Sequence, residues 1–231
     1  MQIQLLADHP DWVIVAKPPN IAVHRSRMVS DRVVLLQLVR DTVGCKVHPV
    51  HRLDRGTSGC LLFAKNRAAT ATLQRAMNDA RATKSYVAFT RGWAQPGGSA
   101  LLDMPLTHEG KTKEAQTFIQ CVAALKDPRC AIILAQLRTG RWHQIRRHLQ
   151  RLSMPVLMDS THGDTRTNRW WRDTYGLDRL ALHCLSLHIP LQDDEDIHVV
   201  CPPPADLIAV WKQLPLWEEA KRAIPALQEI P

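Results

Sequence analysis

The sequence predicts a protein of the α+β class. Strand-like and helix-like segments follow one another irregularly, without the βαβ rhythm that is typical of a parallel sheet. The chain has 231 residues, of which 45% are hydrophobic, so it can bury a substantial core. We find no repeat and no low-complexity segment, and bulk disorder is not expected at this composition.

The first elements lie in residues 3–44. Residues 3–19 predict two short strands around a turn, because apolar runs flank a polar segment and prolines end the second run. Residues 30–44 then predict a helix, with Ser30 or Asp31 as its N-cap and Gly44 just past its end.

A buried strand and a second helix follow. The short apolar run CLLFAK, residues 60–65, comes directly after a glycine and predicts a buried strand. Asn66 is suited to cap the next helix, because its side chain can accept from a free backbone N–H. The expected apolar face of that helix consists of Ala69, Leu73, Ala76, Met77 and Ala80.

The middle of the chain predicts three strands and one helix. Residues 85–92, 131–138 and 180–191 are the predicted strands, and residues 92–100 form a turn. Residues 139–152 change to the helical period, and the helix is expected to bury Ile145, Leu149 and Leu152.

The C-terminal segment differs in charge from the rest. Residues 205–231 predict two acidic helices that pack on the domain, with Trp211 and Trp217 as packing anchors. Residues 192–231 hold three basic and eight acidic residues, so the +8 of the whole chain becomes +13 in residues 1–191. Such an excess favours a polyanionic partner, and the alternative is a basic surface without such a partner.

Several site types are excluded by the absence of their patterns. The six cysteines contain no C-x-x-C pair, and no H-E-x-x-H, P-loop, G-x-G-x-x-G or G-x-S-x-G pattern occurs. We therefore expect no metal and no cofactor. No apolar run reaches the roughly 18–20 residues that span a bilayer, and no signal peptide is recognisable at the start, so a cytoplasmic protein is expected.

Two basic stretches could bind nucleic acid. Residues 138–151 contain five arginines and no acid at the start of a helix, a pattern that favours phosphate contacts over a solvated face. Trp170 and Trp171 lie between Arg169 and Arg172. Such tryptophans could stack on bases if exposed, although tryptophans are more often packing residues.

A lone carboxylate raises the question of catalysis. In HRLDRGTSGCLLFAK, residues 51–65, Asp54 is flanked by Arg52 and Arg55. It is either part of a surface ion pair or a catalytic carboxylate that cations keep ionised, and this segment alone leaves both interpretations open.

Four blocks together resemble the RluA-type pseudouridine synthases. Residues 51–65 resemble the H-R-L-D-x-x-T-S-G signature of that family, and KSYVAFTRG, residues 84–92, resembles its tyrosine block. TGRWHQIRRHL, residues 139–149, is similar to the arginine block, and KPPNIAVHRS, residues 17–26, to the first block. Asn20 replaces the usual glycine of the first block, but asparagine also tolerates left-handed backbone.

The later sequence resembles the tRNA pseudouridine-65 branch of that family, and it has His162 where most relatives in the family have tyrosine. The resemblance implies a single catalytic domain over residues 1–231, without the S4-type RNA-binding domain of several ribosomal-RNA members. It implies a mixed, largely antiparallel central sheet flanked by helices, with the active-site cleft across the sheet. A monomer is expected, and the partner is RNA, most simply tRNA.

The resemblance also implies roles for individual residues. Asp54 is the expected catalytic carboxylate, which attacks the sugar or the uracil or takes a proton from the sugar. Tyr86 is expected to stack on the target base, and Arg146 to pair with Asp54. Arg52 is expected to fill the gap left by the flipped nucleotide. The expected phosphate ligands are Lys17, Lys65, Lys84, Arg141, His143 and Arg147.

Three alternatives remain beside a tRNA enzyme. A ribosomal-RNA synthase of the same family would carry the same blocks. An RNA-binding module that has lost its chemistry would not need Asp54, Tyr86 and Arg146 together. A DNA-binding regulator is the weakest alternative, because no helix-turn-helix pattern is found.

Overall fold

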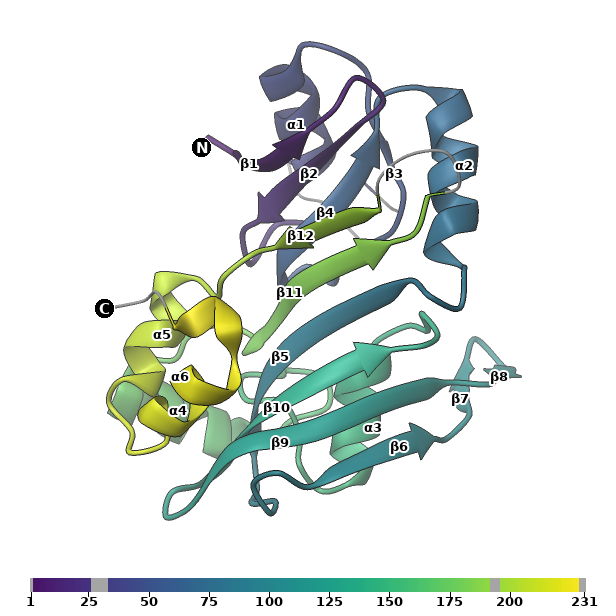
Figure 1. The fold of residues 1–231 in the computed structure, drawn as a ribbon. Helices are drawn as coiled ribbons and strands as arrows, with labels where there is room; N and C mark the ends of the chain where they lie inside the picture. The colour runs from purple at the N-terminus through teal and green to yellow at the C-terminus, as the bar shows by residue number, and fades with distance from the viewer. Residues whose placement is uncertain (1, 26–32, 192–195, 229–231) are drawn as a thin grey trace. The chain divides into compact units, whose positions relative to one another are not determined.

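The computed structural model describes residues 2–25, 33–191 and 196–228. Contacts divide the chain into two compact units, each of which is described by itself (Figure 1). The first unit comprises residues 1–84 and 184–201, and the second comprises residues 85–183 and 202–231. Both units combine antiparallel strands with helices, which confirms the predicted α+β class.

The first unit is built on a sheet of short strands. Its strand order is β1-β2-β4-β11, with β3 paired to β4 and β12 paired to β11. The pairings β1–β2, β2–β4, β3–β4 and β11–β12 are antiparallel. The bounds are β1 Gln4–Asp8, β2 Trp12–Lys17, β3 His48–Pro49, β4 Ser58–Ala64, β11 Leu182–Ile189 and β12 Ile197–Val200.

Two helices complete the first unit. Helix α1, Leu35–Val43, begins later than predicted, because Val34 is still extended and serves as its N-cap. The expected caps Ser30 and Asp31 lie outside the described residues. Helix α2, Arg67–Met77, packs against β4 and begins as predicted, with the Asn66 side chain accepting from the Ala69 N–H at 2.8 Å. It ends before Ala80, which is exposed and therefore not part of its apolar face.

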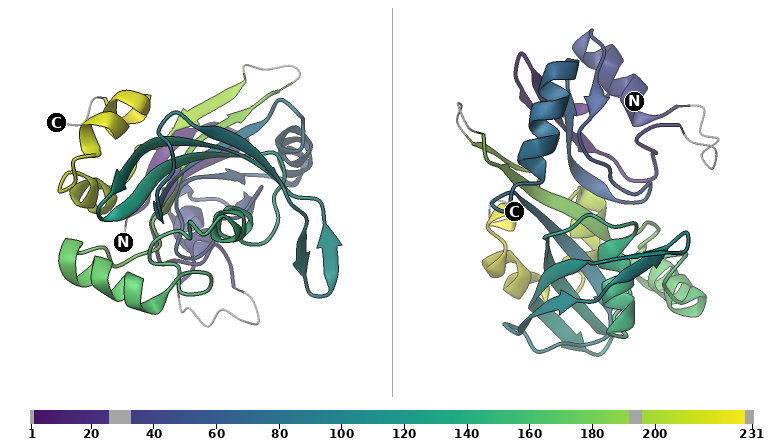
Figure 2. Two further views of the ribbon diagram at one scale, coloured as in Figure 1. Left: turned by 90° about the horizontal axis from the view of Figure 1, so that it is seen from below. Right: turned by 90° about the vertical axis from the view of Figure 1, so that its right-hand side faces the viewer.

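The second unit holds four paired strands, in which β9 is antiparallel to both β10 and β6. Its strand order is β5-β10-β9-β6, and the hairpin β7–β8 forms a separate small sheet. Figure 2 shows this hairpin projecting beyond the strands of the sheet. The bounds are β5 Thr83–Arg91, β6 Ser99–Asp103, β7 Leu106–His108, β8 Lys111–Lys113, β9 Gln116–Lys126 and β10 Arg129–Leu137. The helices are α3 Gln144–Arg151, α4 Thr165–Tyr175, α5 Ala205–Trp211, α6 Trp217–Ala223 and the short 3₁₀ helix η1 Pro225–Leu227.

Some of these elements were not predicted. Strand β9 is 11 residues long. Its first part alternates between buried and more exposed residues, whereas its middle is buried continuously, so its sequence shows no single strand pattern. Helix α4 was also missed, although Asp164 caps its start and Gly176 in left-handed conformation ends it. Helix α3 is shorter than predicted, and Leu152, its C-cap, is 40% exposed instead of buried.

Aromatic residues fill the core of the second unit. Trp171 from α4 packs edge-on against Phe89 of β5, with ring centroids 5.1 Å apart, and Trp211 of α5 contacts Phe89 from 6.3 Å. Trp211 and Trp217 are both buried, so the predicted anchors of the C-terminal helices are confirmed. Burial of large aromatic surfaces is expected to dominate the stability of this core.

The cysteines form no disulfide. Cys45 is exposed, whereas Cys60, Cys121, Cys130, Cys184 and Cys201 are buried. Burial raises the pKa of the Cys121 thiol to about 11 and that of the Cys130 thiol to about 12. The thiols of Cys121 and Cys130 therefore stay protonated at neutral pH and act as small apolar side chains.

Two backbone positions explain residue choices in the blocks. Asn20 has φ 62°, which confirms that asparagine adopts the left-handed conformation there. Gly59 at the start of β4 has φ 112°, and a Cβ atom at this position would lie 2.1 Å from the Cys184 carbonyl oxygen. Only glycine allows the backbone of β11 to approach β4 this closely.

We expect the substitution Gly59→Ala to destabilise the protein by about 3 kcal/mol or more, because the overlap with backbone adds to the cost of the positive φ. Urea denaturation provides the measurement. Gly97→Ala is the matched control, since Gly97 has φ 80° with no atom near its Cβ position, and should cost only about 1 kcal/mol. Equal losses for the two variants would contradict the close-approach argument.

Candidate active site

Asp54 lies in the loop between β3 and β4, and a buried lysine shapes this loop. The ammonium group of Lys17, at the end of β2, donates to the carbonyl oxygens of Pro18, Arg55 and Thr57 at 2.9, 3.0 and 2.7 Å. The Thr57 N–H donates to the Asp54 carbonyl at 3.1 Å and closes a turn. The carbonyls that follow Asp54 are thereby tied to the sheet, which restricts the position of its carboxylate.

Lys17 is therefore not the phosphate ligand that the sequence predicted. Its side chain is 1% exposed, and burying an ammonium group is costly unless polar partners surround it. The three carbonyls provide such partners inside the fold. Its place in the first block reflects loop structure, a possibility that the count of basic residues does not reveal.

His51 fixes the other end of the same loop. Its Nε2 accepts a hydrogen bond from the Leu62 N–H of β4 at 3.2 Å, which requires the unprotonated nitrogen. Burial and the positive charge of Lys84 lower the pKa of His51 to about 3. The imidazole is therefore neutral at physiological pH and acts as a backbone acceptor.

The other basic residues of the first unit differ in exposure. Arg52 and Arg55, on either side of Asp54, are exposed. Lys65 forms an ion pair with Asp8, so part of its charge is already neutralised. Burial lowers the pKa of Lys84, which is half-buried. The RNA contacts of Arg52, Lys65 and Lys84 stay predictions.

In the second unit, Arg146 of α3 forms a buried ion pair with Asp159. Its Nε donates to Oδ2 and its Nη2 to Oδ1, both at 2.7 Å, and the two residues are 6% and 1% exposed. Asp159 Oδ1 also accepts from the backbone N–H groups of Thr161 and His162, both at 2.9 Å. Burial disfavours the carboxylate, but these hydrogen bonds and the charge of Arg146 outweigh it and lower the pKa of Asp159.

The pair with Asp159 sets the direction of the Arg146 guanidinium. Because Asp159 binds Nε and Nη2 in bidentate geometry, the plane of the group is fixed and Nη1 points away from this carboxylate. The sequence reasoning missed Asp159, whose only signal was its place in residues 155–163, where the chain resembles the tRNA branch. The pairing of Arg146 with Asp54 stays a prediction.

Gln144 explains how the arginine block places α3. Its Oε1 accepts from the Thr139 hydroxyl at 2.7 Å and from the Arg141 N–H at 2.9 Å. Its Nε2 donates to the Gln116 carbonyl and the Thr117 hydroxyl, both at 2.9 Å. One buried amide thus connects the turn before α3 to strand β9, and Arg146 lies two residues further along that helix.

Two histidines meet at the start of α3. His143 is the N-cap in left-handed conformation, with φ 51°, and its Nδ1 lies 3.0 Å from Nε2 of His162. Trp142 stacks on His143, with ring centroids 3.7 Å apart. His162 therefore links the Asp159 loop to α3. The phosphate contact of His143 stays a prediction.

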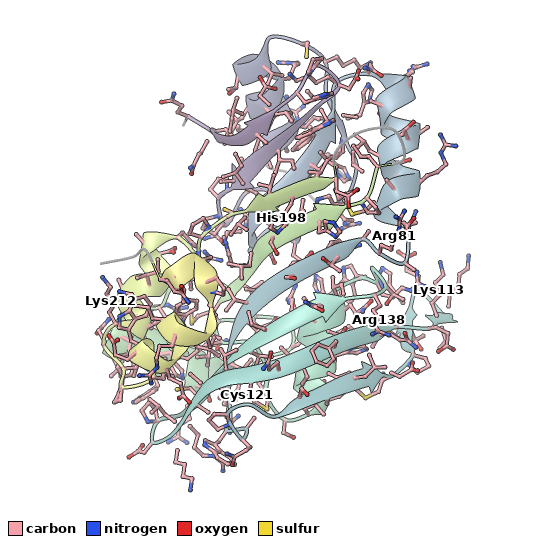
Figure 3. All side chains as sticks on the ribbon, in the orientation of Figure 1. Arg81, Lys113, Cys121, Arg138, His198 and Lys212 are labelled. Carbon is pink, nitrogen blue, oxygen red and sulfur yellow. The ribbon has the colours of Figure 1, made fainter. Side chains whose placement is uncertain are left out.

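Several arginines near α3 bind backbone carbonyls. Arg141 donates to Glu114 at 2.8 Å, Arg147 to Thr107 at 2.9 Å and Arg151 to Pro105 at 3.0 Å. These bonds hold the segment that contains the β7–β8 hairpin, whose Lys113 is exposed (Figure 3). The basic stretch thus has a structural role that the sequence did not reveal. A guanidinium has five N–H donors, so Arg141 and Arg147 can bind phosphate in addition to these carbonyls. Their phosphate contacts stay predictions.

The remaining predicted residue, Tyr86, lies on β5 and is buried in the second unit. Within the described residues, no three His, Cys, Asp or Glu side chains gather in a way that could hold a metal ion. None of the helices that the structure describes has the length and apolar character needed to cross a membrane.

Comparison with known sequences identifies matches over most of the chain. The sequence model of the RNA pseudouridylate synthase family matches residues 11–151. A tRNA pseudouridine synthase C of Haemophilus ducreyi is 31% identical over 209 residues, which cover 81% of this chain and 85% of that protein. A tRNA pseudouridine synthase C of Salmonella typhimurium is 35% identical over 210 residues, covering 81% and 80%.

Solved structures show the same fold. The human RNA pseudouridylate synthase domain containing 1 aligns with a TM-score of 0.77 and 25% identity, over 100% of this chain and 96% of that chain. The human RNA pseudouridylate synthase domain containing 4 aligns with a TM-score of 0.72 and 23% identity, over 91% and 92%.

We expect Asp159→Asn to lower the free energy of unfolding by about 3–5 kcal/mol, because it leaves the buried Arg146 cation without its counter-charge. Chemical denaturation is the measurement. Asp79→Asn is the matched control, since Asp79 accepts the same bidentate bonds from Arg81 on the exposed surface and should change little. Similar losses at both sites would contradict the importance of burial.

We expect stability to fall as the pH drops below about 6.5, because an unfolded His51 binds a proton that the folded one, with a pKa of about 3, does not. This residue should cost about 2 kcal/mol at pH 5 relative to pH 8. Urea midpoints at pH 5, 6.5 and 8 measure the effect. His51→Gln keeps an acceptor for the Leu62 N–H but has no imidazole to protonate in the unfolded state. The number of protons bound on unfolding at acidic pH should therefore be smaller by about one, and the stability should depend less on pH. An unchanged slope would contradict the neutral imidazole.

Proposed function

Because the chain belongs to the RNA pseudouridylate synthase family, it is an RNA pseudouridine synthase, and we propose that it modifies tRNA at uridine 65. The observation that carries the proposal is the match, along about four fifths of this chain, to relatives named tRNA pseudouridine synthase C. The resemblance of residues 155–163 and 175–187 to the tRNA pseudouridine-65 branch supports the position.

The reaction is an isomerisation within RNA. The bond between N1 of uracil and C1′ of ribose breaks, the uracil turns, and C5 forms a bond to C1′. The proton on C5 is then lost and N1 gains one, so the product has the same atoms as the substrate. The enzyme must expose the nucleotide, stabilise the separated base and sugar, and move one proton.

Asp54 is the proposed catalytic carboxylate. The Lys17 and His51 contacts hold its loop in place before RNA binds, so less ordering is needed when the substrate arrives. A carboxylate can form a bond to the sugar or to the uracil, or accept a proton from the sugar as the base departs. All three routes require the ionised form of Asp54.

Tyr86 and Arg146 are proposed to act on the same uridine. Arg146 is held by Asp159 in a fixed orientation, and its permanent positive charge favours the ionised form of a carboxylate that pairs with it. The Tyr86 ring offers a flat surface for the base and a hydroxyl that can take part in the loss of the C5 proton. Arg52 is proposed to occupy the space that the flipped nucleotide leaves in the RNA.

The remaining RNA contacts are proposed to be electrostatic. Residues 1–191 carry a net charge of +13, which favours a polyanion. Arg141, His143, Arg147, Lys65 and Lys84 are the proposed phosphate ligands. Such contacts release counterions, so the affinity for RNA should fall as the salt concentration rises.

The position is tested by mapping. Unmodified tRNA transcripts and ribosomal RNA from a strain without the activity are incubated with the protein, and pseudouridines are then located by chemical sequencing. We expect one new pseudouridine at position 65 of tRNA and none in a tRNA in which that uridine is replaced by cytidine. Modification of ribosomal RNA alone would refute the tRNA proposal but leave the chemistry intact.

We expect Asp54→Asn to reduce the rate of pseudouridine formation by at least about 10³-fold, while RNA affinity and thermal stability change little. The rate is measured with excess enzyme in a single turnover, and the affinity by filter binding. Asp41→Asn, the same change on the exposed face of α1, is the control and should keep full activity. Substantial pseudouridine formation by Asp54→Asn would show that Asp54 is not the catalytic carboxylate.

A further inference from the structure

Helix α4 presents Trp171 to the core and the preceding residue, Trp170, to solvent. Trp171 is 2% exposed and packs against Phe89, whereas Trp170 is 44% exposed. The packing task of this helix is therefore met by Trp171, and Trp170 is not needed for it. Figure 2 shows α4 at the periphery of the second unit.

The exposed tryptophan is held firmly from behind. Its ring meets Trp171 edge to face, with centroids 5.2 Å apart and planes at 85°, and meets Tyr175 at 5.6 Å and 72°. Two further aromatic rings therefore limit its rotamers. A ligand that stacks on such a ring does not have to order it first, which lowers the entropic cost of binding.

The neighbours of Trp170 on the helix surface are cations. Arg166 precedes it by four residues and lies on the same face, Arg169 is adjacent, and Arg172 follows on the flank. All three arginines are exposed. The only acid within the helix is Asp173, so the helix carries a net charge of +2.

The fold makes little use of these cations, although the charge of Arg166 helps to lower the pKa of the capping residue Asp164. Among the residues that the structure describes, none of the three guanidinium groups forms an ion pair or a side-chain hydrogen bond. The arginines near α3 are different, because Arg141 and Arg147 hold backbone carbonyls. The charge on α4 therefore favours an external anion.

We propose that the face of α4 formed by Arg166, Arg169 and Trp170 is a docking surface for RNA, on which an unpaired base stacks on Trp170 while its flanking phosphates bind the two arginines. An aromatic ring beside cations suits this ligand, because each base has a π face and each nucleotide a negative charge. The inference rests on the proposed function, since it takes the RNA substrate as the occupant.

The experiment measures binding and chemistry separately. Trp170→Leu removes the stacking ring but keeps an apolar side chain, and Trp170→Phe keeps a smaller ring. We expect the first variant to raise the Kd for an unmodified tRNA transcript by about tenfold and the second by much less. The single-turnover rate at saturating RNA should stay the same for both, because α4 takes no part in the chemistry.

The charges are tested by the double variant Arg166→Gln, Arg169→Gln. It should weaken binding and make the plot of log K against log salt shallower by about 1.5, as expected for two lost phosphate contacts. The matched control is Arg222→Gln on the exposed surface of α6, which removes an arginine charge from another helix of the same unit. Its Kd and its salt slope should be closer to those of the wild type than the values for the double variant are.

Three results would overturn the docking surface. The first is a Kd within twofold of wild type for both Trp170→Leu and the double variant, and the second is an equal loss for Arg222→Gln. The third is an equal loss for Trp170→Phe and Trp170→Leu. Failure of the proposed function is seen differently, as a wild-type protein that forms no pseudouridine in tRNA, whatever the α4 variants do to binding.

Discussion

The buried ion pair between Arg146 and Asp159 is the constraint on which the second unit's site depends. A guanidinium that is 6% exposed needs a counter-charge, and Asp159 supplies it through two short hydrogen bonds. Asp159 itself is held by the backbone of the residues that follow it. The ion pair thus joins the loop after α3 to the helix.

The first unit also buries a cation, but carbonyl oxygens stabilise it instead of a carboxylate. Lys17 is buried, and its ammonium group is surrounded by carbonyl oxygens of the loop that carries Asp54. His51 accepts from the backbone of β4 at the other end of that loop. Each unit therefore has a buried cationic side chain with fixed hydrogen-bond partners: Lys17 in the loop that carries Asp54, and Arg146, which is itself a residue of the proposed chemistry. The electrostatic cost of burial therefore contributes to preorganisation.

Local patterns predicted what local physics determines. The Asn66 cap, the left-handed Asn20 and the anchors Trp211 and Trp217 follow from side-chain size, capping chemistry and apolar spacing. Contacts between distant residues could not be predicted in this way. Arg146 and Asp159 are 13 residues apart, and nothing in the sequence indicates that they form a pair. The sequence also does not show whether a lysine such as Lys17 is buried or exposed. Helix α4 is the exception, because its cap Asp164 and its terminal Gly176 are local signals of a helix.

The distribution of the cysteines has a practical consequence. Cys45 is exposed, while the other five thiols are buried and those of Cys121 and Cys130 have raised pKa values. A maleimide dye reacts with accessible thiolate, so the folded protein should accept one fluorophore at Cys45 without any mutagenesis. Each molecule would then carry a single optical reporter on the first unit, suited to following its encounter with RNA in real time.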